Sequence, residues 1–113
     1  MIHWKDRITM AEIRRACCEA YGVPEGDFRS DRRPRAVAQA RAAFCFWARI
    51  RTGCSFPQIA MFMNRDHTTV MYHCETYLEK VGRYRDPNAI KCMMAVNRKA
   101  FERVAAWVDW SAA

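Results

Sequence analysis

The stretch CSFPQIAMFMNRDHTTV, residues 54–70, contains two helix starts separated by a polar turn. Ser55 is a residue type that caps helices, and Pro57 suits a first turn, where a backbone N–H has no intrahelical partner. After an Asn-Arg turn, Asp66 can cap a second helix that continues to about Val81. A short helix, a tight turn and a second helix outline a helix-turn-helix, and this outline sets the expected fold.

The second of these helices opens on polar residues that are poor candidates for burial. They are Asp66, His67, Thr68 and Thr69. The apolar stripe expected behind them is Val70, Cys74, Tyr77, Leu78 and Val81. If that stripe packs inward, much of the first turn points outward. The N-terminal residues of the second helix of a helix-turn-helix reach base edges in the major groove, and imidazole and hydroxyl groups can hydrogen-bond there.

Helical periodicity also runs through the segments before this motif. Thr9 and Glu12 form a capping box ahead of a helix that ends near Tyr21, with Gly22 as its stop. Pro24 suits the first turn of a short second helix that leads into a polar, basic connector. The leading part of the chain is therefore expected to be helical as well.

A long helix is predicted over residues 36–52, with a glycine after it as the stop. Its inward stripe is Val37, Ala40, Phe44, Trp47 and Ala48. The chain has 113 residues, 51% of them hydrophobic, which suits one domain with a modest core. The fold class predicted from these patterns is all-α.

Positive charge is concentrated in one segment of the chain. The net charge is +7, from nineteen basic and twelve acidic residues. Between Arg29 and Arg51 there are seven arginines and one acid, Asp31, which gives that segment +6. Guanidinium groups bind phosphate through two parallel hydrogen bonds, so the cluster indicates nucleic acid as a partner. A solvated basic face is the alternative explanation.

The motifs together resemble a known family. RDHTTV (65–70) resembles the signature of the C-terminal DNA-binding domain of the bacterial replication initiator DnaA. RRPRAVAQAR (32–41) is similar to that family's basic loop and long-helix start. CSFPQIAMFMNRDHTTV is similar to its helix-turn-helix, and AEIRRACCEAYGVPEGDFRS (11–30) to its leading helices. The resemblance covers about residues 8–82 and implies a fold of the DnaA C-terminal, Trp-repressor-like type with an extra C-terminal helix.

The resemblance also implies roles for individual residues. Those that match major-groove readers are Asp66, His67, Thr68 and Thr69. Arg33 matches an arginine inserted into the minor groove, and Arg35, Arg41 and Pro57 match further DNA contacts. Our expectation from charge adds Arg32 and Arg65 to a set of phosphate-binding arginines with Arg33, Arg35 and Arg41. As a phosphate contact, Arg41 should contribute about one unit to the salt dependence of binding.

Other features of the family are not carried over. No GxxxxGK[ST] phosphate loop occurs in the chain, so ATP-driven assembly is not expected. The family commonly has glutamine where this chain has Ala42. His67, His73 and Cys74 lack the spacing of a metal site, and no nucleophile is paired with a base. We therefore expect no enzyme activity, no cofactor and no metal.

The cysteines and the chain start bear on location. The chain contains six cysteines but no CxxC pair, and several fall at apolar helix positions, where cysteine behaves as a small hydrophobe. We expect buried free thiols. The charged start MIHWKDR does not read as a secretion signal, and no apolar run is long enough to cross a membrane. A cytoplasmic, nucleoid-associated protein is expected.

The tail after RDPN (85–88) is the least familiar part. We divide the chain into a DNA-binding domain, residues 1–84, and a C-terminal helical extension, residues 85–113. A single helix is predicted from about Ala89 to Asp109. Its coiled-coil-like seam is Ile90, Met94, Asn97, Phe101, Val104 and Val108. The seam favours either a helix folded back on its own domain or a weak homodimer, with a monomer expected in the first case.

The sequence predicts a protein that binds double-stranded DNA in a sequence-specific manner without ATP hydrolysis. The sites implied are similar to the DnaA box, and the role implied is replication initiation or its regulation. Two alternatives remain open. One is a protein–protein adaptor or antagonist that contacts the host initiator or origin machinery. The other is a small transcriptional regulator.

Overall fold

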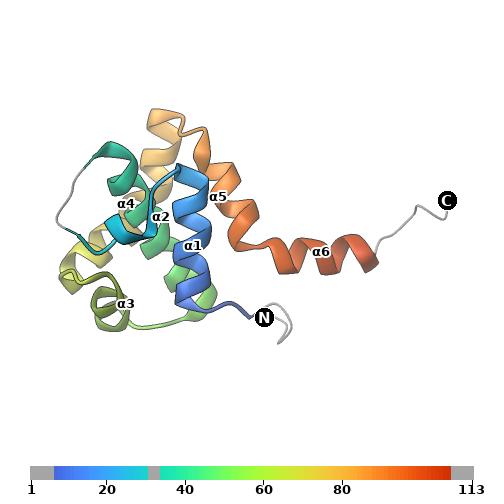
Figure 1. Ribbon diagram of the computed structural model, residues 1–113, viewed down its shortest axis with the longest axis horizontal. Helices are drawn as coiled ribbons and strands as arrows, with labels where there is room; N and C mark the ends of the chain where they lie inside the picture. The colour runs from blue at the N-terminus through green and yellow to red at the C-terminus, as the bar shows by residue number, and fades with distance from the viewer. Residues whose placement is uncertain (1–6, 31–33, 108–113) are drawn as a thin grey trace.

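The computed structural model describes residues 7–30 and 34–107, the last five of these by backbone alone. The elements are α1 (Met10–Tyr21), the 3-10 turn η2 (Glu25–Asp27), α2 (Arg35–Thr52), α3 (Phe56–Met63), α4 (His67–Tyr84), α5 (Asn88–Val96) and α6 (Arg98–Trp107). The described residues contain no strand, so the predicted all-α fold is confirmed. Helices α1 to α5 form one bundle (Figure 1).

The first helix has the ends that the sequence predicts. The Thr9 side chain accepts a hydrogen bond from the Glu12 backbone N–H, and the Glu12 carboxylate accepts one from the Thr9 N–H. The helix stops at Gly22, which is left-handed with φ 67°. Glycine adopts this conformation without a Cβ clash. The segment after Pro24, expected to be a short α-helix, is only a single 3-10 turn.

Helix α2 runs through the centre of the core. Val37, Ala40, Phe44 and Ala48 are buried as predicted, and Trp47 is half-buried. The Phe44 ring meets the Phe28 ring edge-on, with centroids 5.0 Å apart. It also stacks on the Phe62 ring of α3, at 5.4 Å. One aromatic side chain thus connects the loop before α2 to the helix-turn-helix.

The cysteines serve as core side chains. All six are free thiols. Cys17, Cys18, Cys45 and Cys92 are buried, as expected, whereas Cys54 and Cys74 are half-buried. Burial raises the pKa of the Cys18 thiol to about 11. The Cys17 thiol, on α1, lies 3.4 Å from that of Cys92 on α5. Burial raises the pKa of Cys17 as well, which keeps this contact uncharged.

A chain of hydroxyl and carboxylate groups ties the end of α4 to α1. The Tyr21 hydroxyl donates to the Asp86 carboxylate at 2.6 Å and lies 3.3 Å from the Tyr77 hydroxyl. The other Asp86 oxygen accepts the Asn88 backbone N–H at 2.9 Å. Burial raises the pKa of Tyr77 to about 12. The C-terminal half of α4 is therefore fixed against the bundle.

The tail differs from the predicted single helix. It breaks at Asn97, where φ is −103°, into α5 and α6. The Asn97 side-chain oxygen accepts a hydrogen bond from the Arg51 guanidinium at 2.5 Å, and its amide donates to the Met93 carbonyl at 2.8 Å. These bonds hold the residue at a helix end, so Asn97 does not occupy a continuous seam. Of the predicted seam, Val104 and Val108 lie outside the described side chains.

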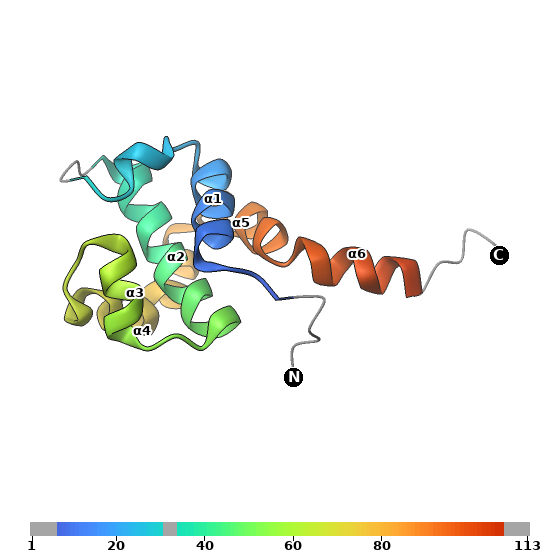
Figure 2. The ribbon, with the colours of Figure 1, turned by 60° about the horizontal axis from the view of Figure 1, so that its bottom comes forward.

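The two tail helices have different surroundings. Helix α5 packs on α1, and its Cys92 and Val96 belong to the same core cluster as Ile13. Helix α6 projects away from the bundle, on the side opposite α3, in both views (Figures 1 and 2). Folding back onto the domain is therefore observed for α5 alone. The division at residue 84 stays a prediction.

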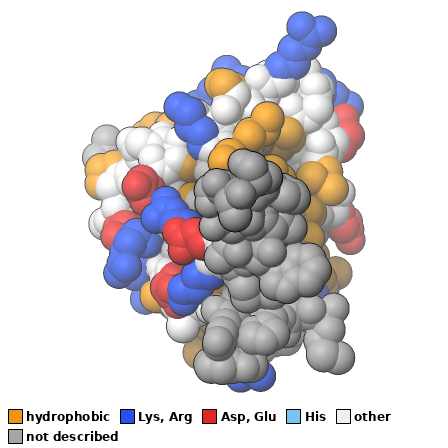
Figure 3. All heavy atoms as spheres, turned by 90° about the vertical axis from the view of Figure 1, so that its right-hand side faces the viewer, with side chains coloured by type: hydrophobic (Ala, Val, Ile, Leu, Met, Phe, Trp, Pro, Cys, Tyr) orange, Lys and Arg blue, Asp and Glu red, His pale blue; other side chains and the backbone are white. Residues whose placement is uncertain are grey.

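The end of the molecule from which α6 projects carries charges of both signs. Acidic and basic side chains are interspersed on one flank of it (Figure 3). The Lys99–Glu12 ion pair, at 3.3 Å, joins α6 to α1. Among the described helices, none is sufficiently long and apolar to cross a membrane.

Candidate nucleic-acid interface

The first turn of α4 faces outward. His67 and Thr68 are exposed and Thr69 is half-buried, while Val70, the next residue, is completely buried. The turn before α4 is fixed by Asn64, which ends α3 in the left-handed conformation with φ 58°. This geometry presents an imidazole and two hydroxyls at a helix N-terminus, where the backbone N–H groups also favour an anion.

Asp66 occupies the N-cap position but not in the way predicted. Its backbone is extended and its carbonyl accepts the Thr69 N–H at 3.1 Å, as an N-cap carbonyl should. Its carboxylate makes no capping hydrogen bond, so the predicted side-chain cap is wrong. The exposed carboxylate is available to accept a hydrogen bond from a base amino group.

The buried face of α4 is narrower than the predicted stripe. Val70 and Tyr77 are buried, and Cys74 and Val81 are half-buried. Leu78 is 63% exposed, so its predicted burial is wrong. Tyr77 takes the inward position beside it and packs against Phe46 of α2, with ring centroids 5.0 Å apart. The side chains of adjacent helical residues point about 100° apart, so α4 buries Tyr77 and leaves Leu78 exposed.

Arg41 lies inside the protein, although we expected a phosphate contact there. Only 5% of its surface is exposed. Its Nε donates to the Phe28 carbonyl at 2.9 Å, and its Nη2 donates to the carbonyls of Asp27, at 2.9 Å, and Ser30, at 2.6 Å. The guanidinium thus binds the backbone that leads into the basic segment 31–35.

Arg65, in the turn of the helix-turn-helix, reaches the same backbone. Its Nη2 donates to the Ser30 carbonyl at 2.5 Å, and its Nη1 donates to the Asn64 carbonyl at 2.9 Å. We call the Ser30 carbonyl with the guanidiniums of Arg41 and Arg65 the Ser30 junction. It links α2, the turn before α4 and the start of the basic segment. Charge-assisted bonds of this kind are stronger than neutral ones.

The other predicted contacts lie around this junction. Arg35 begins α2 and is exposed, and Pro57 is exposed in the first turn of α3. Arg32 and Arg33 lie outside the described residues. Connected elements therefore carry Arg35, Arg65 and the first turn of α4. Arg41 is buried behind them.

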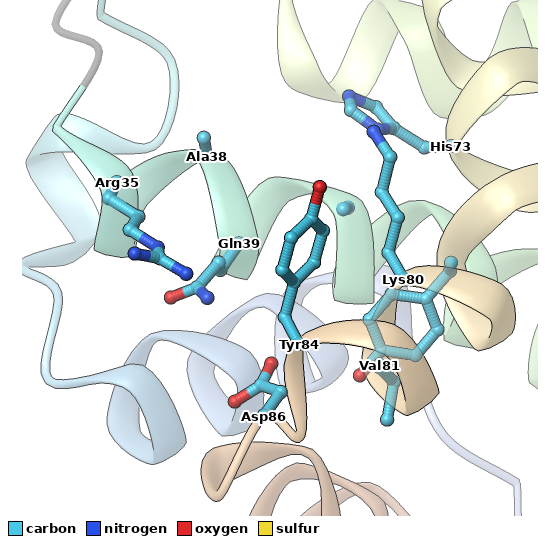
Figure 4. Close-up of a pocket in the computed structure, with 10 residues that line it drawn as sticks. Arg35, Ala38, Gln39, His73, Lys80, Val81, Tyr84 and Asp86 are labelled. Atoms are coloured by element: carbon cyan, nitrogen blue, oxygen red, sulfur yellow. The ribbon is translucent and has the colours of Figure 1, made fainter.

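A groove between α2 and α4 continues from the first turn of α4. Its first part, a cavity of about 370 Å³, is lined by Ala38, Arg41, Met63, Arg65, Thr69 and His73. Its second part, about 430 Å³, shares Ala38 and His73 and extends to Arg35, Lys80, Tyr84 and Asp86 (Figure 4). Reasoning from the sequence missed His73 and Lys80 as site residues. Their seven-residue spacing, which repeats on one helix face, was the available signal.

Comparison with known proteins agrees with this geometry. The family described as "Bacterial dnaA protein helix-turn-helix" matches residues 10–76, which is more than half of the chain. The chain belongs to this family. The matched segment of the DnaA family runs from the start of α1 into α4, so it includes the Ser30 junction and the exposed first turn.

Individual DnaA relatives match over similar spans. The chromosomal replication initiator protein DnaA of Caulobacter vibrioides (strain NA1000 / CB15N) is 45% identical over 67 residues, 58% of this chain and 14% of the relative. That of Sphingopyxis alaskensis is 41% identical over 73 residues, 64% and 16%. That of Caulobacter sp. (strain K31) is 38% identical over 94 residues, 82% and 19%. The chain thus spans less than a fifth of each of these relatives.

Within residues 7–30 and 34–107, no group of three or more histidine, cysteine and acidic side chains could hold a metal ion. Burial, Lys80 and Arg41 together lower the pKa of His73. Beside the Asp66 carboxylate, this surface presents the hydrogen-bonding groups of His67 and Thr68 and the Arg35 guanidinium, which suit recognition of a polyanion.

Proposed function

We propose that the chain is a sequence-specific double-stranded DNA-binding domain. The observation that carries this is the outward first turn of α4, which Arg65 of the preceding turn ties to the Ser30 carbonyl that Arg41 also binds. Membership of the DnaA helix-turn-helix family supports it. The sites proposed are similar to the DnaA box, and the process is replication initiation or its regulation, without ATP hydrolysis by this chain.

The residues divide by what they contact. His67, Thr68 and Thr69 read base edges in the major groove, and Asp66 accepts a hydrogen bond from a cytosine amino group. Arg35 binds phosphate, together with Arg32 and Arg33 of the basic segment. Arg65 and Arg41 bind the Ser30 carbonyl, immediately before that segment, Arg65 from the surface and Arg41 from inside.

Fluorescence anisotropy with two labelled duplexes tests the proposal. One duplex carries a DnaA box and the other a scrambled version, at about 0.15 M salt, where the charge-driven contribution is already reduced. We expect a preference of about 100-fold or more for the box. If both duplexes bound equally and the affinity fell with added salt, the chain would contact phosphate but would not recognise the bases as proposed. Absence of binding to either duplex would refute the proposal.

Substitutions in the first turn of α4 should reduce binding to the preferred duplex only. His67→Ala should cost roughly 1–3 kcal/mol on that duplex, because one base contact is lost. Thr69→Ala should behave in the same way. Binding to scrambled DNA should change little, because the lost contacts are to base edges and not to phosphate. Met61→Ala, at an exposed position of α3, is the control. Equal weakening on both duplexes would contradict direct base reading.

A protein partner is the second candidate function, and the tail favours it. Ile90, Met94 and Phe101 are exposed large hydrophobic side chains on α5 and α6. They would be the contact surface of an adaptor or antagonist of the host initiator, or of a weak homodimer. If the chain bound no duplex, a protein partner would become the first candidate function.

A further inference from the structure

The groove between α2 and α4 is lined mainly by cationic groups. Five of its side chains can carry positive charge: Arg35, Arg41, Arg65, His73 and Lys80. Asp86 is the one acid among the lining residues. Both of its carboxylate oxygens already accept hydrogen bonds, from the Tyr21 hydroxyl and the Asn88 N–H. An anion that enters the groove therefore meets an excess of positive charge.

The ammonium group of Lys80 lies closer to the first turn of α4 than the sequence position of Lys80 suggests. Its side chain extends back along α4, as long helical side chains do, toward the His73 ring (Figure 4). Its Nζ donates to the Tyr72 hydroxyl at 2.8 Å and lies 4.5 Å from the centre of the Tyr72 ring. The partner is a hydroxyl and an aromatic ring and not a carboxylate, so this contact does not pair the lysine with an acidic side chain.

The groove also lies where a duplex backbone would have to pass. It begins at Thr69 in the first turn of α4 and reaches Arg35 at the start of α2, next to the basic segment. In the proposed complex Thr69 contacts a base edge in the major groove and Arg35 contacts a phosphate. The sugar-phosphate backbone that borders the major groove therefore has to pass along the α2–α4 groove between these two residues.

We propose that the α2–α4 groove binds a phosphate of this backbone, with Lys80 and His73 as its ligands. This inference rests on the proposed function and adds a contact to it. The phosphate accepts hydrogen bonds from the Lys80 ammonium and from a ring N–H of His73. Neither residue belongs to the helix N-terminal turn or to the basic segment, so the contact is independent of both.

A phosphate here makes binding depend on pH through His73. In the free protein burial, then Lys80, then Arg41 lower its pKa, so the ring is neutral at pH 7.5. A bound phosphate opposes the last two effects and favours the protonated ring. Affinity should therefore rise as pH falls from 7.5 to 5.5. The other titratable or charged groups around the groove are Arg35, Arg65, Tyr72, Tyr77, Tyr84 and Asp86.

The test measures the salt dependence of binding to a mixed-sequence duplex of about twenty base pairs. Lys80→Gln should lower the slope of log K against log salt by about one unit, the contribution of one phosphate contact. Lys80→Arg should keep the wild-type slope. Lys91→Gln is the matched control, because Lys91 is exposed on α5 and does not line the groove. Equal slopes for Lys80→Gln and Lys91→Gln would overturn the inference.

His73→Gln provides a second readout. Wild-type protein should bind the same duplex more tightly at pH 5.5 than at pH 7.5, and His73→Gln should lose part of this gain. The comparison isolates His73, because the variant differs from the wild-type protein at that residue alone. An identical pH profile for both proteins would overturn the role of His73. If the wild-type protein bound no duplex at all, the proposed function would fail together with this inference.

Discussion

Replacing Arg41 with alanine should lower the free energy of unfolding by roughly 2–4 kcal/mol, a large effect for an arginine on a helix. The reason is that Arg41 is 5% exposed and donates to three carbonyls before α2. The buried Phe28 carbonyl would lose its guanidinium donor. Urea denaturation followed by circular dichroism measures the change.

Arg41→Ala should also reduce the preference for the specific duplex more than it reduces the charge-driven binding to any duplex. Without Arg41, the Ser30 carbonyl keeps its bond to Arg65 but loses its bond to α2, so the loop before α2 is held less firmly relative to α4. The salt slope should fall by less than one unit, because the Arg41 charge is buried behind the surface.

Two variants separate this explanation from a phosphate contact. Arg41→Lys keeps the charge but not the forked geometry, so it should also be destabilised. Arg98→Ala removes the same charge from an exposed position on α6 and should leave stability nearly unchanged. A stable Arg41→Ala protein whose salt slope falls by one unit would show that Arg41 contacts phosphate directly.

Phe44→Ala should be the most destabilising single change, at about 3–5 kcal/mol. The ring is completely buried and contacts Phe28 on one side and Phe62 of α3 on the other. Its loss removes both ring contacts and leaves a cavity between the bundle and the helix-turn-helix. Thermal and urea unfolding measure the loss.

The control for this change lies on the same helix. Ile50 is 51% exposed, and Ile50→Ala should change stability by well under 1 kcal/mol by the usual behaviour of surface positions. If Phe44→Ala were as stable as Ile50→Ala, the position of α3 would not depend on the α2 core. An unchanged unfolding midpoint in Phe44→Ala would contradict the packing of Phe44 against Phe28 and Phe62.

Much of the fold could be predicted because it follows from local patterns. The capping box at Thr9, the glycine stop at Gly22 and the stripe through Phe44 each depend on residues within one or two helical turns. The family resemblance placed the helix-turn-helix by the same kind of local sequence. The first turn of α4 was predicted to point outward because the stripe behind it begins at Val70, and the structure agrees.

What the sequence did not reveal depends on contacts between distant residues. Arginine is rarely buried without partners, and the partners of Arg41 are backbone carbonyls, which leave no mark in the sequence. The tail breaks because Asn97 bonds Arg51, 46 residues earlier. The His73–Lys80 groove exists only once α2 and α4 are packed. In each case helical periodicity identified the element but not its neighbour.

The Ser30 junction bears on the spacing of DNA contacts in the proposed complex. Because Arg41 and Arg65 bond the same carbonyl, the α4 turn and the Ser30 backbone, which leads into the basic segment, are tied together. If both engage one duplex, the number of base pairs between their targets is set by the protein. One inserted base pair shifts the second target by about 3.4 Å and rotates it by about 35° around the axis. A site with correct bases at the wrong spacing would then be rejected as firmly as one with a wrong base.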